Sequence, residues 1–171
     1  MKFSKIALSA LSFAVLGFLA LGLASTPASA STSVSTTFNV TATVAASCNI
    51  TAPTLAFGTY TGGQVTANTA ITVTCNAAST PYNIGLNVGL NGTGPYARYM
   101  INGTNKLSYG LYQNTALSTN WGTTIGTDTE AGTSSATALT ATTVTVYGVI
   151  PAAQVVPTGS YADTIMATIT Y

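Results

Sequence analysis

Few residues in this sequence have side chains that could carry out catalysis. The 171-residue chain has no histidine, three acidic residues and two cysteines. Asp128 and Glu130 could form a carboxylate pair, but acidic residues in a stretch rich in Gly, Thr and Ser are usually solvated. Asp163 precedes the apolar part of the last predicted strand, and we expect its oxygens to order a turn or a neighbouring backbone group. Since most general-base, triad and transition-metal mechanisms need histidine, we expect no enzyme, metal site or cofactor.

Cys48 and Cys75 are the only cysteines of the chain. In an exported protein two cysteines most simply form one disulfide. Closing the loop between Cys48 and Cys75 with a disulfide would stabilise the fold by about 3.5 kcal/mol. Two free, buried thiols are the alternative that the residues leave open.

Trp121 and the nine tyrosines raise the possibility of carbohydrate binding, because aromatic faces stack on sugars. In a β-sandwich such residues more often belong to the core. The Asn-x-Thr sequons would accept glycans only in a eukaryotic secretory pathway, and the Thr-rich composition accounts for them by chance. They begin at Asn39, Asn49, Asn91 and Asn102.

The N-terminal sequence predicts export. A short basic start at 1–5 is followed by an apolar run at 6–24 and by a Pro-Ala-Ser-Ala sequence at 27–30. This pattern is typical of a secretory signal peptide with an A-x-A cleavage site, here after Ala30. The apolar run could nearly span a bilayer, but the small residues behind it favour cleavage, and we expect no membrane span afterwards. The remaining chain has the length of one domain.

Charged side chains are rare after residue 30. Arg98 and Lys106 stand against Asp128, Glu130 and Asp163. So few basic residues cannot form the positive stripe that neutralises phosphates, which argues against nucleic-acid binding. Low charge also gives little protection against self-association, and this suits a protein that assembles.

Apolar residues recur with a period of two, which predicts β-strands with one buried face. The predicted strands lie within 34–44, 71–75, 82–90, 107–111, 144–150 and 165–171, with a short apolar and aromatic piece at 55–60. Turn residues separate them at 61–63, 91–95, 102–103 and 156–159. No helical periodicity follows residue 30, so we expect an all-β sandwich. We expect residues 122–137 to form a long solvated connection.

The predicted sandwich lacks a strand at the C-terminal end of the chain and has a spare strand at the N-terminal end. The last predicted strand ends at Tyr171, whereas an immunoglobulin-type sandwich needs one more strand after it. The alternating segment 31–44 is spare, and an apolar strand that its own domain cannot bury is an edge-pairing hazard. Donation of this segment to the open sheet of the next copy would satisfy both ends and yield a filament. Pairing within its own domain, as an ordinary first strand, is the alternative.

Four segments together resemble the spore coat protein U family, which includes the pilins of the archaic chaperone-usher pathway. They are ITVTC at 71–75, LSYGLY at 107–112, VYGVIP at 146–151 and GSYADT at 159–164. The resemblance covers essentially all of the chain after the signal peptide. It implies an incomplete immunoglobulin-like β-sandwich that lacks its final strand and is completed by donor-strand exchange. Residues 31–45 would be the donor strand and 46–171 the pilin domain.

The resemblance also implies partners, site residues and a location. A periplasmic chaperone would supply a temporary strand, and an outer-membrane usher would exchange it for the N-terminal strand of another copy or a related subunit. The resulting surface fibre would support adhesion and biofilm formation. The implied donor residues are Val34, Thr36, Phe38, Val40, Ala42 and Val44, and the implied acceptor strand contains Ile165, Ala167, Ile169 and Tyr171. The family disulfide would join Cys48 to Cys75, and the chaperone would grip the carboxylate of Tyr171.

A self-contained secreted coat protein or carbohydrate-binding module is the alternative function. It belongs to a different class, because it would fold and act as a monomer.

Overall fold

The computed structural model describes residues 31–171. The predicted signal peptide at 1–30 lies outside the described residues. The chain divides into two units, 1–41 and 42–171, and each is considered by itself. Within residues 31–171 every strand belongs to the second unit, and no helix occurs.

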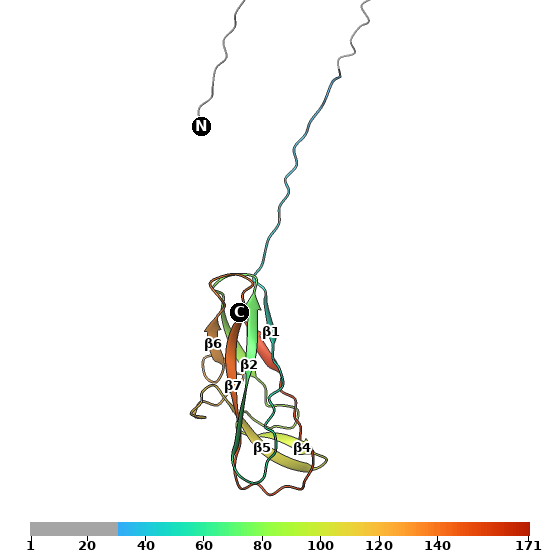
Figure 1. The fold of residues 1–171 in the computed structure, drawn as a ribbon. Coiled ribbons are helices and arrows are strands. Elements are labelled where there is room, and N and C mark those ends of the chain that lie inside the picture. Colours follow the sequence, from blue (N-terminus) through green and yellow to red (C-terminus); the bar gives the residue numbers. More distant parts are fainter. Residues whose placement is uncertain (1–30) are drawn as a thin grey trace, which may run out of the picture. The chain divides into compact units, whose positions relative to one another are not determined.

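The second unit consists of two antiparallel sheets (Figure 1). The larger sheet has the order β1-β2-β7-β5-β4, and the smaller has the order β6-β3-β8. The strands are β1 (Cys48–Thr51), β2 (Val65–Cys75), β3 (Pro81–Leu86), β4 (Arg98–Asn102), β5 (Asn105–Tyr112), β6 (Glu130–Thr133), β7 (Thr142–Ile150) and β8 (Ala167–Thr170). The predicted all-β sandwich is therefore confirmed.

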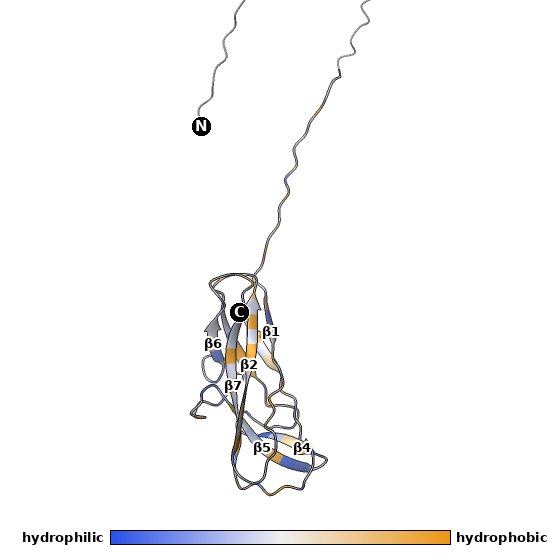
Figure 2. Ribbon diagram, viewed as in Figure 1, coloured by the Kyte–Doolittle hydropathy of each residue, from blue (hydrophilic) through white to orange (hydrophobic). Residues whose placement is uncertain are grey.

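The core lies between the two sheets and is built from alternate residues of each strand. Figure 2 shows hydrophobic and paler bands alternating along β2. The buried core side chains include Ile71, Val73, Tyr82, Ile84, Leu86, Leu107, Tyr109, Leu111, Val146 and Ile150. Each such side chain stabilises the fold by roughly 1.5–3 kcal/mol relative to exposure. Trp121 also belongs to the core, where it is fully buried and its Nε1 donates to the Ile84 carbonyl at 2.8 Å.

Two predictions about strand limits were wrong. The strand predicted at 82–90 ends at Leu86, because the chain then enters a loop in which Gly89 has a φ of 84°. The connection predicted at 122–137 contains β6, which pairs with β3. Pairing is possible there because Gly132 has no side chain, and the ring of Tyr82 occupies the place that a Cβ would take.

A disulfide joins Cys48 of β1 to Cys75 of β2, as predicted. The two residues are directly opposite each other in the β1–β2 register. The bond secures a strand of only four residues to the longest strand of the sandwich.

Arg98, one of the two basic residues after residue 30, is completely buried. Its guanidinium donates hydrogen bonds to backbone carbonyls from Nε, Nη1 and Nη2. The acceptors are Asn87 O at 3.0 Å from Nε, Pro95 O at 2.9 Å from Nη1, and Leu86 O at 3.0 Å and Trp121 O at 2.6 Å from Nη2. Desolvation by burial lowers the pKa of Arg98. The side chain joins the end of β3 to the loop at 87–97 and to the segment carrying Trp121.

Replacing Arg98 should therefore destabilise the fold strongly. In Arg98→Met the buried carbonyls of Leu86 and Trp121 lose their donor, and we expect the free energy of unfolding to fall by about 3 kcal/mol or more. Urea unfolding of the oxidised protein measures the change. Lys106→Met is the control, because the Lys106 ammonium is exposed and lies 5.2 Å from the Tyr99 ring centroid. We expect this variant to lose less than about 1 kcal/mol, so equal losses in both variants would contradict the role of Arg98.

Candidate functional site

A groove of about 1220 Å³ opens in the sandwich between two segments of irregular chain. One wall, residues 52–62, follows β1, and the other wall, residues 154–165, precedes β8. We call these the first wall and the second wall. Core side chains of the strands form the floor, among them Ile71, Leu86, Leu107, Tyr109, Leu111, Val146 and Ile150.

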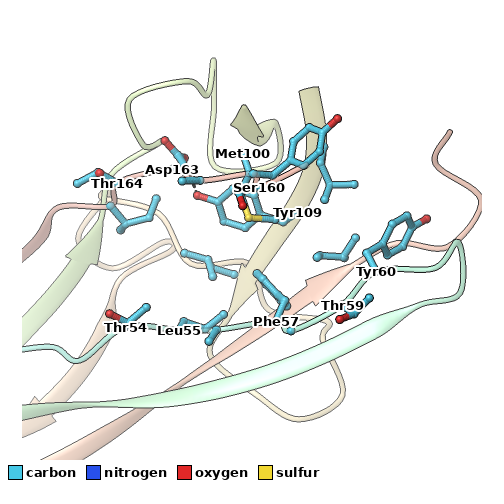
Figure 3. A pocket seen from close by; sticks show the side chains of 18 of the residues that line it. Thr54, Leu55, Phe57, Thr59, Tyr60, Met100, Tyr109, Ser160, Asp163 and Thr164 are labelled. Carbon is cyan, nitrogen blue, oxygen red and sulfur yellow. Dashed lines mark hydrogen bonds between the residues drawn. The ribbon is translucent and has the colours of Figure 1, made fainter. Parts of the chain in front are cut away.

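The first wall places apolar side chains over the floor. Leu55 and Phe57 are half-buried on it, and Figure 3 shows them beside the groove, with Tyr109 and Met100 across from them. The rings of Phe57 and Tyr109 meet edge to face, with centroids 6.1 Å apart. Phe57 can come this close to β7 because Gly148 faces it, and a Cβ at that position would lie 2.8 Å from the ring. The groove is thus lined mainly by apolar and aromatic groups.

The backbone in the middle of the first wall is unpaired in the described part of the chain, whereas near its ends the Pro53 carbonyl accepts from Thr69 Oγ1 and the Gly62 carbonyl accepts from the Ala153 amide. Within residues 31–171, no backbone–backbone hydrogen bond involves the amides or carbonyls of residues 54–59. The segment is held at its ends, by β1 on one side and by Tyr60 on the other. The hydroxyl of Tyr60 donates to the Pro151 carbonyl at 3.1 Å and accepts from the Gln154 amide at 2.9 Å. The first wall therefore presents an unpaired backbone edge.

The second wall and β8 also present an unpaired edge. Even-numbered residues there bond to β3, β4 and the loop between them. These bonds run from Ala162 N to Ile101 O (3.2 Å), from Leu90 N to Thr164 O (3.2 Å) and from Asn87 N to Met166 O (3.0 Å). In an extended strand the next residue directs its backbone groups to the opposite edge. Among the described residues no hydrogen bond satisfies the backbone of Asp163 or Ile165.

Asp163 fixes the position of the second wall. Its Oδ1 accepts from Leu90 N at 3.0 Å and from Asn91 Nδ2 at 2.8 Å, and its Oδ2 accepts from the Tyr109 hydroxyl at 2.6 Å. The predicted role of Asp163, ordering a neighbouring backbone group, is confirmed. Desolvation and this hydrogen bond raise the pKa of Tyr109. Asp163 thus ties the wall both to the floor and to the loop after β3.

The other two acidic residues, Asp128 and Glu130, lie in different structural settings. Asp128 Oδ1 accepts from the Thr124 amide at 2.6 Å and so closes a turn. Glu130 lies on β6, where burial raises its pKa. Neither residue lines the groove. Among residues 31–171 no cluster of three potential metal ligands is found.

The predicted site residues lie in two places. The implied acceptor residues Ile165 and Ala167 line the groove, Ile169 follows them on β8, and Tyr171 is 54 % exposed. The implied donor residues all lie outside the strands, and the large ones are strongly exposed. Val34 is 95 % exposed, Phe38 81 %, Val40 83 % and Val44 87 %, while Thr36 and Ala42 are exposed as well.

Sequence reasoning did not identify the first wall as part of the site. It recognised 55–60 only as a short apolar and aromatic piece. The available signal was Pro53 before this piece and Gly58 within it, since proline cannot donate to a ladder and Gly58 has a φ of 74°. Both residues interrupt the regular pairing that β1 begins.

The fold and the site together define a β-sandwich of two sheets with an open groove beside the free edge of its smaller sheet. The Spore Coat Protein U domain matches residues 34–168, so the chain belongs to that family, as the resemblance predicted. Comparison with curated proteins found no match. In the described part of the chain, no helix is long and apolar enough to cross a membrane.

One similar solved structure is the CsuC-CsuE chaperone-tip adhesion subunit pre-assembly complex from the archaic chaperone-usher Csu pili of Acinetobacter baumannii. The similarity has a TM-score of 0.56 and 23 % sequence identity, and it covers 75 % of this chain. It spans only 40 % of the other chain. The similarity therefore establishes a shared fold.

Tyr109→Phe tests the link between the floor and the second wall. At neutral pH the variant leaves Asp163 with one donor fewer, so we expect the free energy of unfolding to fall by about 1–2 kcal/mol. The pKa of Tyr109 is raised in the folded state, so its contribution is present below the unfolded-state pKa of about 10 and is lost as pH rises above it. The wild type should therefore lose stability above pH 10 more steeply than Tyr109→Phe. Urea unfolding between neutral pH and pH 11 checks this, and equal slopes would contradict it.

Proposed function

We propose that this protein is a structural subunit of an exported surface fibre of the archaic chaperone-usher type. In this proposal the groove of one copy binds the N-terminal segment of another. One observation carries the proposal: the chain has an apolar groove with unpaired backbone on both walls, and an exposed apolar segment of alternating pattern. Residues 31–45 would be the donor strand, and 46–171 the pilin domain.

The donor segment has the pattern that such a groove requires. In an extended strand, residues spaced by two lie on one face. Val34, Thr36, Phe38, Val40, Ala42 and Val44 would therefore all face the floor. The backbone of the donor would pair with the free edge that includes Asp163 and Ile165, as in other cases of strand addition. Phe38, the largest of these side chains, would find aromatic partners in Phe57 and Tyr109.

The free energy of such an insertion is large. Val34, Phe38, Val40 and Val44 would contribute about 1.5–3 kcal/mol each, or about 6–12 kcal/mol together as an upper value. Hydrogen bonds to the open edge add to this, and the entropy of association opposes it. A seated donor should therefore dissociate slowly. Because each copy both donates and accepts, head-to-tail exchange produces an open filament.

In this proposal the open apolar groove would also have to be covered before assembly. The solved structure described above is a chaperone-tip adhesion subunit pre-assembly complex. By analogy, a periplasmic chaperone would fill the groove of this protein with a temporary strand and hold the carboxylate of Tyr171. An outer-membrane usher would then exchange that strand for the donor segment. The signal peptide at 1–30 would direct the chain into this route, and the fibre at the cell surface would serve adhesion and biofilm formation.

A self-contained coat protein or sugar-binding module is less consistent with this arrangement. Trp121, the best candidate for stacking on a sugar, is fully buried. An independent coat protein would be expected to fill its own groove, whereas residues 31–47 form no strand.

Deletion of residues 31–44 should abolish polymerisation without preventing chaperone binding. The test is expression in a periplasm with the matching chaperone and usher, followed by gels run with and without boiling. The wild type should give a ladder of oligomers that boiling collapses, and the deletion should give none. A deletion variant that still forms the ladder would contradict strand donation.

Phe38→Asp is a sharper test, because the adjacent Asn39 provides a matched control. A charge at 38 would be buried in the apolar groove, and we expect the amount of oligomer to fall at least about ten-fold. Asn39→Asp adds the same charge on the opposite, solvent-facing side of the strand, so its ladder should match the wild type. If Phe38→Asp left the ladder unchanged, or if both variants lost it equally, the proposed donor face would be wrong.

A further inference from the structure

The proposed donor segment is fastened to its own subunit by the side chain of Asn76. Residues 45–47 connect Val44 to the first residue of β1, Cys48. We call these three residues the root of the segment. Three hydrogen bonds hold the root: Asn76 N donates to Ser47 O at 2.9 Å, Ser47 N donates to Asn76 Oδ1 at 2.8 Å, and Asn76 Nδ2 donates to Ala45 O at 3.0 Å. All of these residues belong to the unit 42–171. We call residues 45–47 with Asn76 the root clamp.

The root clamp extends the β1–β2 ladder beyond the end of β2. Because Cys48 pairs with Cys75, Ser47 and Asn76 form the next pair in the same register. After Asn76 the chain turns away, so its backbone cannot continue the ladder. The carboxamide does so instead, since it bonds to groups on both sides of Ala46, as a peptide group of a neighbouring strand would. Asparagine suits this place because its side chain both donates and accepts.

Nothing else in the described chain holds the root as directly. Ala45, Ala46 and Ser47 are exposed, so burial contributes little to their position. A linker of such small residues is flexible when free. The disulfide between Cys48 and Cys75 begins one residue further on and provides a rigid base for the clamp. The conformation of residues 45–47 therefore depends on Asn76.

We infer that Asn76 is a positioning residue for assembly, which sets the direction in which the donor strand leaves its subunit. The inference rests on the proposed function. When Val44 is seated in the groove of the next copy and Ala45 is clamped, no free residue separates the two folded bodies. The joint between successive subunits is then stiff, and the angle between them varies little. Groove filling itself does not depend on Asn76.

The test compares fibres of the wild type, Asn76→Ala and Asn114→Ala by electron microscopy. Asn114 is a matched control, because its carboxamide likewise bonds to the backbone and side chain of a nearby loop residue, Ser118. All three proteins should form the boiling-sensitive ladder. We expect the spread of angles between successive subunits to be about two-fold or more wider in Asn76→Ala, and unchanged in Asn114→Ala. Asn76→Asp keeps the acceptor for Ser47 and loses the donor to Ala45, so it should be intermediate.

Amide hydrogen exchange at Ser47 in the exported subunit tests the clamp without a fibre. Loss of its acceptor in Asn76→Ala should speed exchange about three- to ten-fold, and Asn76→Asp should retain most of the protection. Asn76→Ala fibres with the wild-type spread of angles, or unchanged exchange at Ser47, would overturn the role of Asn76. So would loss of the ladder in both Asn76 variants. Absence of a ladder from the wild type would instead overturn the proposed function.

Discussion

The structure depends on one constraint, that backbone amides and carbonyls near an apolar interior need hydrogen-bond partners. Most of the sandwich meets it through the ladders of its two sheets. The walls of the groove do not, because the edge carrying Asp163 and Ile165 faces residues 54–59 across an open space. In the proposed assembly a donor strand placed there would bond to these free backbone groups and cover the floor.

Two of the few charged groups of the chain, Asp163 and Arg98, stabilise segments around this space. Asp163 ties the second wall to Tyr109 and to the loop after β3, and Arg98 joins that loop to Trp121 and the end of β3. Arg98 is buried inside the fold, and Asp163 lies at the groove. A carboxylate and a guanidinium suit this task because each bonds several partners at once. The outer surface is left with little charge, which favours association between copies.

The root of the N-terminal segment is likewise held by only a few residues. The disulfide, the β1–β2 register and the Asn76 carboxamide act within a few residues of one another. Together they make residues 45–47 a continuation of the folded body, whereas Val34, Phe38 and Val40 before them are exposed. In the proposed assembly, binding would depend on the apolar side chains of residues 34–44 and fibre geometry on Asn76.

The sequence alone determined the fold class, most of the strands, the disulfide and the family, because these follow from period-two alternation, cysteine count and local motifs. It also indicated that 31–44 was spare. Only the tertiary structure decided that residues 52–62 and 154–165 form the walls of a groove, that Arg98 is buried, and that β6 pairs with β3. The reason is physical: alternation shows that a residue faces a core, but not which strand lies beside it. Pairing of distant segments is decided only when the sheets pack.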